Sequence, residues 1–245
     1  MSEQKRQDIH NSNVPVVCQS CEARHRGVCG ALSTSQLSQL SKHATIQQVP
    51  AGQAFESGED TEERCANVLK GVVKITKLMA DGRQQIVGLQ FAPDFLTRSS
   101  SLRSYTEAQT ATDVTICSFP RRVLDEMIRD VPELGNRLRN QALRELDEAR
   151  DWMLTLGRKT AAEKVASFIY LLARNLDPEA EADGITRQFV LPLARGDIAD
   201  FLGLTSETVS RQMTKLRNSG IISVENSRSI SILDVDALAE ASGGS

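Results

Sequence analysis

The sequence predicts an α+β fold with an N-terminal β-roll, then a long helix, then a C-terminal helix-turn-helix with a β-hairpin wing. Two observations carry this prediction. Short strand-like stretches separated by glycines run from about 45 to 119, and helical periodicities prevail from about 133 onward. With 245 residues, 40% hydrophobic and 25% charged, the chain is long enough for two modest domains of ordinary globular composition.

The net charge and the first residues narrow the function classes only slightly. The formal net charge is −3, so a nucleic-acid-binding role would need a local concentration of positive charge. No apolar run follows Met1–Arg6, and no stretch approaches about 18 consecutive apolar residues, so we expect neither a signal peptide nor a membrane span. The expected location is the cytoplasm, where thiols stay reduced.

Residues 1–30 form a cysteine-rich segment that we expect to bind a metal centre. Three of the five cysteines stand as Cys18-x2-Cys21-x7-Cys29, in a polar stretch without helix or strand periodicity. Two thiolates with the first spacing can hold one metal centre, and nearby backbone amides can bond their sulfurs. Free thiols are the weaker interpretation. Zinc with His25 as a ligand, and an iron–sulfur cluster with a fourth thiolate from further along the chain, both fit this spacing.

Residues 31–120 are expected to form a β-roll that acts as the sensory domain. Val72–Lys77 and Gln85–Phe91 flank Asp81-Gly82, a residue pair that tolerates positive φ, so they predict a hairpin. Repeated hairpins of this kind indicate a small roll or barrel. The last strand covers Val114–Phe119.

Residues 121–157 are expected to form a long helix, regular from about Glu133 to Leu156. Apolar or small side chains recur there every three or four residues and make one continuous seam. The seam consists of Leu138, Ala142, Leu146, Ala149, Met153 and Leu156. Such a stripe can pack on its own domain or on the same helix of a second subunit. We favour the homodimer, because a two-fold protein suits the module that follows.

Residues 158–245 are expected to form a winged helix-turn-helix. Gly203 supplies the tight turn after the first helix, and Thr205 or Ser206 can cap the second helix. The second helix has apolar residues at i, i+4 and i+7, and Gly220 ends it. Two short strands on either side of Asn226-Ser227 then form the wing.

The outer face of the second helix carries the side chains that we expect to contact double-stranded DNA. They are Ser206, Glu207, Ser210, Arg211 and Lys215. Arg211 can donate two hydrogen bonds to guanine, Glu207 can accept one from cytosine, and Lys215 is better placed for a phosphate. An ordinary helical hairpin is the weaker interpretation, because the turn, the polar face and the wing all agree.

Together these motifs resemble the Fnr-type regulators of the Crp/Fnr superfamily, in particular the FnrL/FnrN branch. The resemblance covers nearly the whole chain and is strongest in four stretches. These are Cys18–Cys29, Val114–Phe119, Leu156–Ala161 and Arg195–Arg211. The resemblance implies a dimeric, oxygen-responsive transcription regulator. The set of Glu207, Ser210 and Arg211 implies a palindromic DNA site resembling TTGAT-N4-ATCAA.

In that family four cysteines hold an oxygen-labile 4Fe-4S cluster, and the resemblance implies Cys18, Cys21, Cys29 and Cys117 as its ligands. Cys65 is then a spare thiol buried in a strand. No cyclic nucleotide is expected, because residues 93–98 lack the glutamate of the nucleotide-binding branch. RNA polymerase is an expected partner, with the hairpin tip Met79–Arg83 as its candidate surface.

The resemblance also implies a switch. A cluster that joins the N-terminal segment to Cys117 would hold that segment on the roll and set the position of the long helix, and oxygen would release it. The named seam positions carry no charge, so we expect the protein to dimerise appreciably without its cluster. The alternatives are a regulator of the same fold with zinc or haem, the haem on His25 or His43, and a small redox or electron-transfer protein. No catalytic signature stands out, so we do not expect an enzyme.

Overall fold

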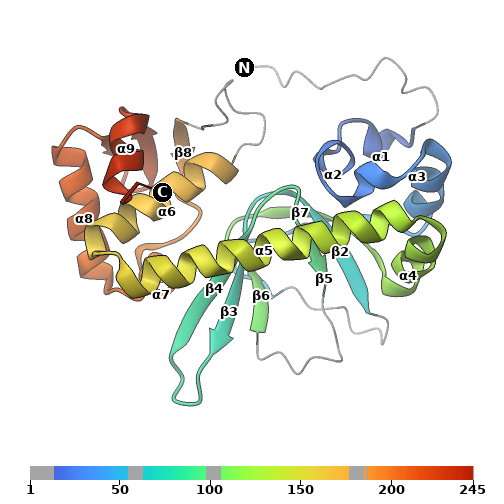
Figure 1. Ribbon diagram of the computed structural model, residues 1–245, viewed down its shortest axis with the longest axis horizontal. Coiled ribbons are helices and arrows are strands. Elements are labelled where there is room, and N and C mark those ends of the chain that lie inside the picture. Colours follow the sequence, from blue (N-terminus) through green and yellow to red (C-terminus); the bar gives the residue numbers. More distant parts are fainter. Residues whose placement is uncertain (1–13, 55–62, 98–105, 177–184, 186, 245) are drawn as a thin grey trace.

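Helix α5 (Pro132–Arg158) runs across the whole molecule and organises the rest of it (Figure 1). The N-terminal helices lie at one of its ends, the C-terminal domain lies at the other, and the β-roll lies along its side. This computed structural model describes residues 14–54, 63–97, 106–176, 185 and 187–244. It confirms the α+β class and the order of roll, long helix and winged helix-turn-helix.

The cysteine-rich segment folds into short helical turns. They are α1 (Val16–Gln19), α2 (Glu22–His25) and the 3-10 turn η2 (Val28–Ala31), and α3 (Thr34–Ser41) follows them. Turns of four residues are too short to show a period, so the sequence pattern predicts no helix there. A capping box between Ser33 and Gln36 starts α3. The first strand of the roll begins at Thr45, after these helical turns.

The roll consists of two antiparallel sheets. The first has the strand order β1-β7-β2-β5 and the second β4-β3-β6. The strands of the first sheet are β1 (Thr45–Val49), β2 (Arg64–Lys70), β5 (Phe95–Thr97) and β7 (Val114–Pro120). Those of the second are β3 (Val73–Leu78), β4 (Gln84–Gln90) and β6 (Thr106–Thr110). The predicted hairpin is β3–β4, and Gly82 takes a φ of 85° in its turn.

Side chains alternate along these strands, so the first sheet has two different faces. The inner face packs inside the roll, and its residues include Ala66, Val68, Val114 and Ile116. The outer face carries two cross-strand pairs, Cys65 with Phe119 and Asn67 with Cys117. The N-terminal turns cover this outer face, where Cys65 and Phe119 share a core with Cys29.

The segment 121–157 forms two helices where the sequence analysis predicts one. Helix α4 (Arg121–Asp130) ends before Val131, and α5 begins at Pro132. Proline disfavours helical backbone at the residue before it but is well tolerated at the first position of a helix. Only α5 is therefore the long helix of the prediction.

In its described residues, the C-terminal domain combines four helices with a three-stranded sheet of order β8-β10-β9. The helices are α6 (Ala161–Asn175), α7 (Arg195–Leu202), α8 (Ser206–Asn218) and α9 (Val235–Ala241). The strands are β8 (Gln188–Val190), β9 (Ile222–Glu225) and β10 (Ser229–Ile232). No helix in the described part of the chain has the length and apolar composition needed to cross a membrane.

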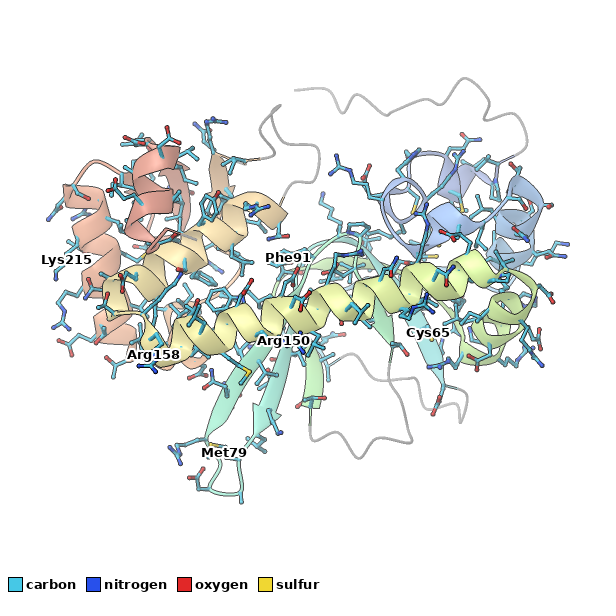
Figure 2. The ribbon with its side chains drawn as sticks, viewed as in Figure 1. Cys65, Met79, Phe91, Arg150, Arg158 and Lys215 are labelled. Atoms are coloured by element: carbon cyan, nitrogen blue, oxygen red, sulfur yellow. The ribbon has the colours of Figure 1, made fainter. Side chains whose placement is uncertain are left out.

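The C-terminal domain rests on the second sheet of the roll, and the two share one apolar core. Phe201 of α7 packs on Trp152 of α5 in a tilted arrangement, with ring centroids 4.5 Å apart. The Nζ of Lys74 lies 2.6 Å from Oδ1 of Asp197, so an ion pair joins β3 to α7. Phe91, labelled in Figure 2, belongs to this shared core.

Candidate functional site

Four of the five cysteines meet between the N-terminal turns and the outer face of the first sheet. Cys18 lies in α1, Cys21 caps α2, Cys29 lies in η2 and Cys117 lies in β7. Their thiols are close enough for a negative charge on one to raise the pKa of another. Negative charge on any of the other three thiols raises the pKa of Cys29, and negative charge on Cys18 or Cys21 raises the pKa of Cys117. We call these four side chains the four-thiol group.

Burial keeps the four-thiol group protonated when no metal is bound. Desolvation is the largest cause of the raised pKa at all four positions, and it brings the pKa of Cys117 to about 12. The nearby backbone amides of Arg24 and Ala23 lower the pKa of Cys21 and oppose the rise there. A metal centre needs thiolates, so its binding would release these protons and offset the repulsion between the sulfurs.

Cys65 stands apart from the four-thiol group. It is fully buried in β2, and desolvation raises the pKa of its thiol. The charged groups that act on it are Arg121, Asp125 and Glu63, and no other cysteine is among them. Its place near the α4 end of the sheet can be followed in Figure 2.

The geometry does not complete a zinc site with histidine. The Nε2 of His25 lies 3.4 Å from the carbonyl oxygen of Gln19, and His43 is exposed. Four thiolates around one zinc would stand about 3.8 Å apart, because Zn–S bonds are about 2.3 Å long. In the described ranges, no three His, Cys, Asp or Glu side chains form a group that could hold a single metal ion. In a 4Fe-4S cluster, by contrast, irons and sulfides stand between the protein ligands.

An arginine joins the cysteine turns to α5. Arg137 donates from Nη1 to the carbonyl oxygen of Gly27 at 3.1 Å. Its guanidinium also closes over Gly30, where a Cβ would stand 2.5 Å from Nη1 and 2.7 Å from the carbonyl oxygen of Arg24. Only glycine fits such an approach. A displacement of the turns around Cys29 would therefore act directly on α5.

A buried asparagine donates to one thiol of the four-thiol group. Asn67 is 1% exposed and lies directly opposite Cys117 in the β2–β7 ladder. Its Nδ2 lies 3.6 Å from Sγ of Cys29. Its Oδ1 is buried and has no hydrogen-bond partner among the described residues. The sequence analysis missed Asn67, although a lone amide in the apolar run Cys65–Leu69 is a signal that could have pointed to it.

Helices α7 and α8 form the predicted helix-turn-helix. Gly203 takes a left-handed φ of 62° between them, and Thr205 caps α8 by accepting from the backbone N–H of Thr208 at 3.2 Å. Gly220, with a φ of 75°, follows the end of α8 as predicted. The wing hairpin turns at Asn226 and Ser227, which both have positive φ. This turn is of the kind that matches the twist of a two-stranded ribbon.

All five predicted DNA contacts are exposed on α8, and Lys215 lies at the outer edge of the molecule (Figure 2). Ser206, Glu207, Ser210 and Arg211 share the first half of the helix. The hydroxyl of Ser210 donates to the carbonyl oxygen of Ser206 at 2.9 Å, which leaves its oxygen able to accept. Glu207 stands in the first turn, where the helix dipole favours a carboxylate.

A hollow of about 310 Å³ lies between α8 and the wing, and the arginines that line it add positive charge to this face. Arg195, Ser210, Arg217 and Ser227 are among its lining residues. Arg195 donates from Nη2 to the carbonyl oxygen of Ser227 at 3.2 Å, and burial lowers its pKa. Its Nη1 is buried and has no partner in the described part of the chain. The sequence analysis missed Arg195, which could be found as a basic first residue of α7.

The exposed stripe of α5 differs from the predicted seam. Leu138 and Leu156 are half-buried, and Leu138 packs on the core beneath the cysteine turns. Met153 and Leu146 are exposed, at 72% and 46%. The large apolar side chains of the exposed stripe are Leu143, Leu146, Met153 and Leu154, with Ala142 and Ala149 exposed at its edge. The inner face of α5 buries Leu134 together with the polar Gln141 and Thr155, so apolar side chains are divided between the two faces and do not mark one stripe.

One charge lies within the exposed stripe, although the predicted seam has none. Arg150 follows Leu146 by one helical turn and precedes Met153 and Leu154 (Figure 2). Its Nη1 lies 2.9 Å from Oδ1 of Asp147 on the same helix. Surface pairs of this kind contribute little to stability. An apolar stripe of this size, left exposed on one chain, is typical of an interface.

A β-roll, a long helix with an exposed apolar stripe and a winged helix-turn-helix define a DNA-binding regulator. Residues 46–131 match the family model of the cyclic nucleotide-binding domain, and residues 163–241 match that of the Crp-like helix-turn-helix domain. The chain is 51% identical over 233 residues to a probable transcriptional activator of Rhizobium leguminosarum bv. viciae. That match covers 95% of this chain and 96% of the relative.

Two further proteins are similar over most of their length. The transcriptional activator protein FnrL of Cereibacter sphaeroides is 39% identical over 92% of each chain. The solved structure of FixK2 from Bradyrhizobium japonicum superposes with a TM-score of 0.72 at 31% identity, over 82% of this chain and 98% of that one. This chain therefore belongs to the Crp/Fnr family of transcription regulators. It is a regulator and not an enzyme, as the sequence analysis expects.

Proposed function

We propose that this protein is an oxygen-responsive transcriptional activator that binds DNA as a homodimer and carries a 4Fe-4S cluster. Its ligands are Cys18, Cys21, Cys29 and Cys117. The observation that carries the proposal is the four-thiol group: these four thiols act on one another's pKa, and Cys65 is not among them. The similarity to proteins named as transcriptional activators supports activation.

The donor set suits such a cluster. Four sulfur ligands are what a 4Fe-4S centre requires, and the Asn67 amide supplies a hydrogen bond to the sulfur of Cys29. When bound, the cluster would supply an oxygen-labile link between the N-terminal turns and β7. The turns hold Arg137 through the carbonyl of Gly27, so their release changes what holds α5 in place.

The proposed DNA site is the one that the resemblance to Fnr-type regulators implies, and the exposed residues of α8 are consistent with it. Arg211 and Glu207 read guanine and cytosine, and Ser210 adds a polar contact, on a palindrome resembling TTGAT-N4-ATCAA. To read two half-sites, two subunits joined along the exposed stripe of α5 would have to present their copies of α8 about 34 Å apart, one helical turn of DNA. Lys215, Arg195 and Arg217 contact phosphates.

No cyclic nucleotide is part of this proposal. A hollow of about 190 Å³ between the two sheets and α5 is lined by Gln90, Phe95, Thr97 and Glu145, with no basic side chain among the described residues around it. The Glu145 carboxylate would repel a cyclic phosphate there. Residue 98 of the predicted stretch lies outside the described residues. The hairpin tip Met79–Arg83 is exposed and extends away from the roll, which suits a contact with RNA polymerase in the cytoplasm (Figure 2).

The test is iron and acid-labile sulfide analysis of protein purified without oxygen, with an absorption spectrum before and after exposure to air. The wild-type protein and Cys65→Ala are expected to hold about four irons and four sulfides per chain, with a brown absorption that bleaches in air. Cys117→Ala is expected to lose the cluster. Zinc, or no metal, in the wild-type protein would leave a DNA-binding regulator and remove the oxygen sensor.

A further inference from the structure

We propose that Asn67 is a positioning residue for the cluster, and that its side-chain N–H donates to the sulfur of Cys29 and makes the cluster more resistant to oxygen. This inference rests on the proposed function and deepens it. Asn67 lies in strand β2 of the roll, outside the cysteine segment, so a strand of the roll would help to set the oxygen sensitivity of the cluster.

The first observation is geometric. Asn67 and Cys117 face each other across the β2–β7 ladder, so their side chains project from the same face of the sheet. The Nδ2 of Asn67 reaches 3.6 Å from Sγ of Cys29, which belongs to the turns covering that face. The amide therefore stands between two of the proposed ligands, one from the N-terminal turns and one from the roll.

The second observation is energetic. Asn67 is 1% exposed, and its Oδ1 has no hydrogen-bond partner in the described part of the chain. A buried polar atom without a partner costs stability, so a leucine, which has the same branched shape without polar atoms, would suit an apolar sheet face better. The Oδ1 end of the Asn67 amide therefore adds nothing to the stability of the fold. Its N–H group, however, is aimed at the sulfur of a proposed ligand.

Hydrogen bonds to cysteine sulfurs are among the factors that set the potential of an iron–sulfur centre. An N–H donor draws electron density from the sulfur and weakens its bond to iron. The centre then gives up an electron less readily, and air attacks it more slowly. Removal of the donor is expected to reverse both effects while the four ligands stay in place.

The experiment compares wild-type protein with Asn67→Leu, and with Asn67→Ala in case the leucine does not fit. Iron and sulfide content, the resonance Raman frequencies of the Fe–S(Cys) stretches and the bleaching rate in air-saturated buffer are measured on protein purified without oxygen. Both variants are expected to keep the wild-type iron and sulfide content. Their Fe–S(Cys) stretches are expected to move to higher frequency, and bleaching is expected to become about three- to tenfold faster.

A matched control is Gln212→Leu. Gln212 is also buried, and its Oε1 also has no partner among the described residues, but it lies in α8 at the other end of the molecule. Its Raman spectrum and bleaching rate should equal those of the wild-type protein.

Urea unfolding of the metal-free, reduced proteins separates a structural role from the proposed one. Asn67→Leu is expected to be at least as stable as the wild-type protein. A loss of stability and of iron content with unchanged Raman frequencies would overturn the inference and leave Asn67 as a structural residue. A normal wild-type cluster whose spectrum and bleaching do not respond to either variant would overturn the inference alone. A wild-type protein without a cluster would overturn the proposed function with it.

Discussion

Asp94 ties the stability of the fold to pH at the point where the roll meets α5. Its carboxylate accepts from the backbone N–H of Phe91 at 2.8 Å. Burial raises its pKa from an ordinary 3.8 to about 6, and repulsion from Glu145 and Glu148 of α5 adds to the rise. The Phe91 amide and Arg144 act in the opposite direction.

The sign follows from the raised pKa. The folded protein binds the proton of Asp94 more tightly than the unfolded chain does. Its contribution to the free energy of unfolding is therefore fully present below about pH 3.8 and is lost as the pH rises through about 6. At about 1.4 kcal/mol per pKa unit, the whole contribution is about 3 kcal/mol. Between pH 5 and pH 7.5 the free energy of unfolding should therefore fall by roughly 1 kcal/mol from this group.

The perturbation is Asp94→Asn, which keeps an oxygen for the Phe91 amide and removes the titration. Urea unfolding of the metal-free, reduced protein is measured between pH 5 and pH 7.5 for both chains, at one protein concentration. We expect the variant to be more stable than the wild-type protein at pH 7.5, with the difference shrinking toward pH 5. Parallel pH profiles for the two chains would refute the reasoning.

Three further predictions concern DNA, dimerisation and coupling. Arg211→Ala should weaken binding to the palindrome by about 1–3 kcal/mol per half-site and relax base preference. Lys215→Ala should weaken binding to all DNA sequences alike and lower the slope of the salt dependence of binding by about one per subunit. Gel-shift titrations in which both variants behave alike would contradict the assignment. The cluster-free protein should sediment as a dimer at micromolar concentration and Leu146→Asp as a monomer, and a wild-type monomer would contradict the prediction. Arg137→Leu should keep its iron, but exposure to air should hardly change its affinity for DNA. In the wild-type protein we expect air to weaken DNA binding by about 1–3 kcal/mol. If air weakens DNA binding of the variant as much as that of the wild-type protein, Arg137 does not have this role.

Local chemistry made the DNA-binding half of the chain predictable. The left-handed Gly203, the cap at Thr205 and the wing turn at Asn226 each depend on a few consecutive residues, and each lies where the sequence places it. The hairpin at Gly82 was predictable for the same reason. The start of the roll was not, because four-residue turns leave no period to detect.

Contacts between distant parts of the chain could not be read from local patterns. Asn67 and Cys29 are 38 residues apart, and Arg137 and Gly27 are 110 apart. The pairing of Cys117 with the N-terminal cysteines came from the resemblance, since spacing alone left zinc and iron–sulfur open. The predicted seam on α5 contains both exposed and half-buried side chains, because the spacing of apolar residues along a helix does not tell which face the rest of the chain covers.

The length of α5 makes it a lever. Its 27 residues span about 40 Å, from the turn that holds Arg137 to the start of the C-terminal domain. A tilt of about 5° at one end would carry the other about 3.5 Å, far more than any single hydrogen bond can stretch. In a two-fold dimer the displacements of the two subunits add. A small change beside the cysteines would therefore change the distance between the two copies of α8, which must match the spacing of the half-sites in DNA.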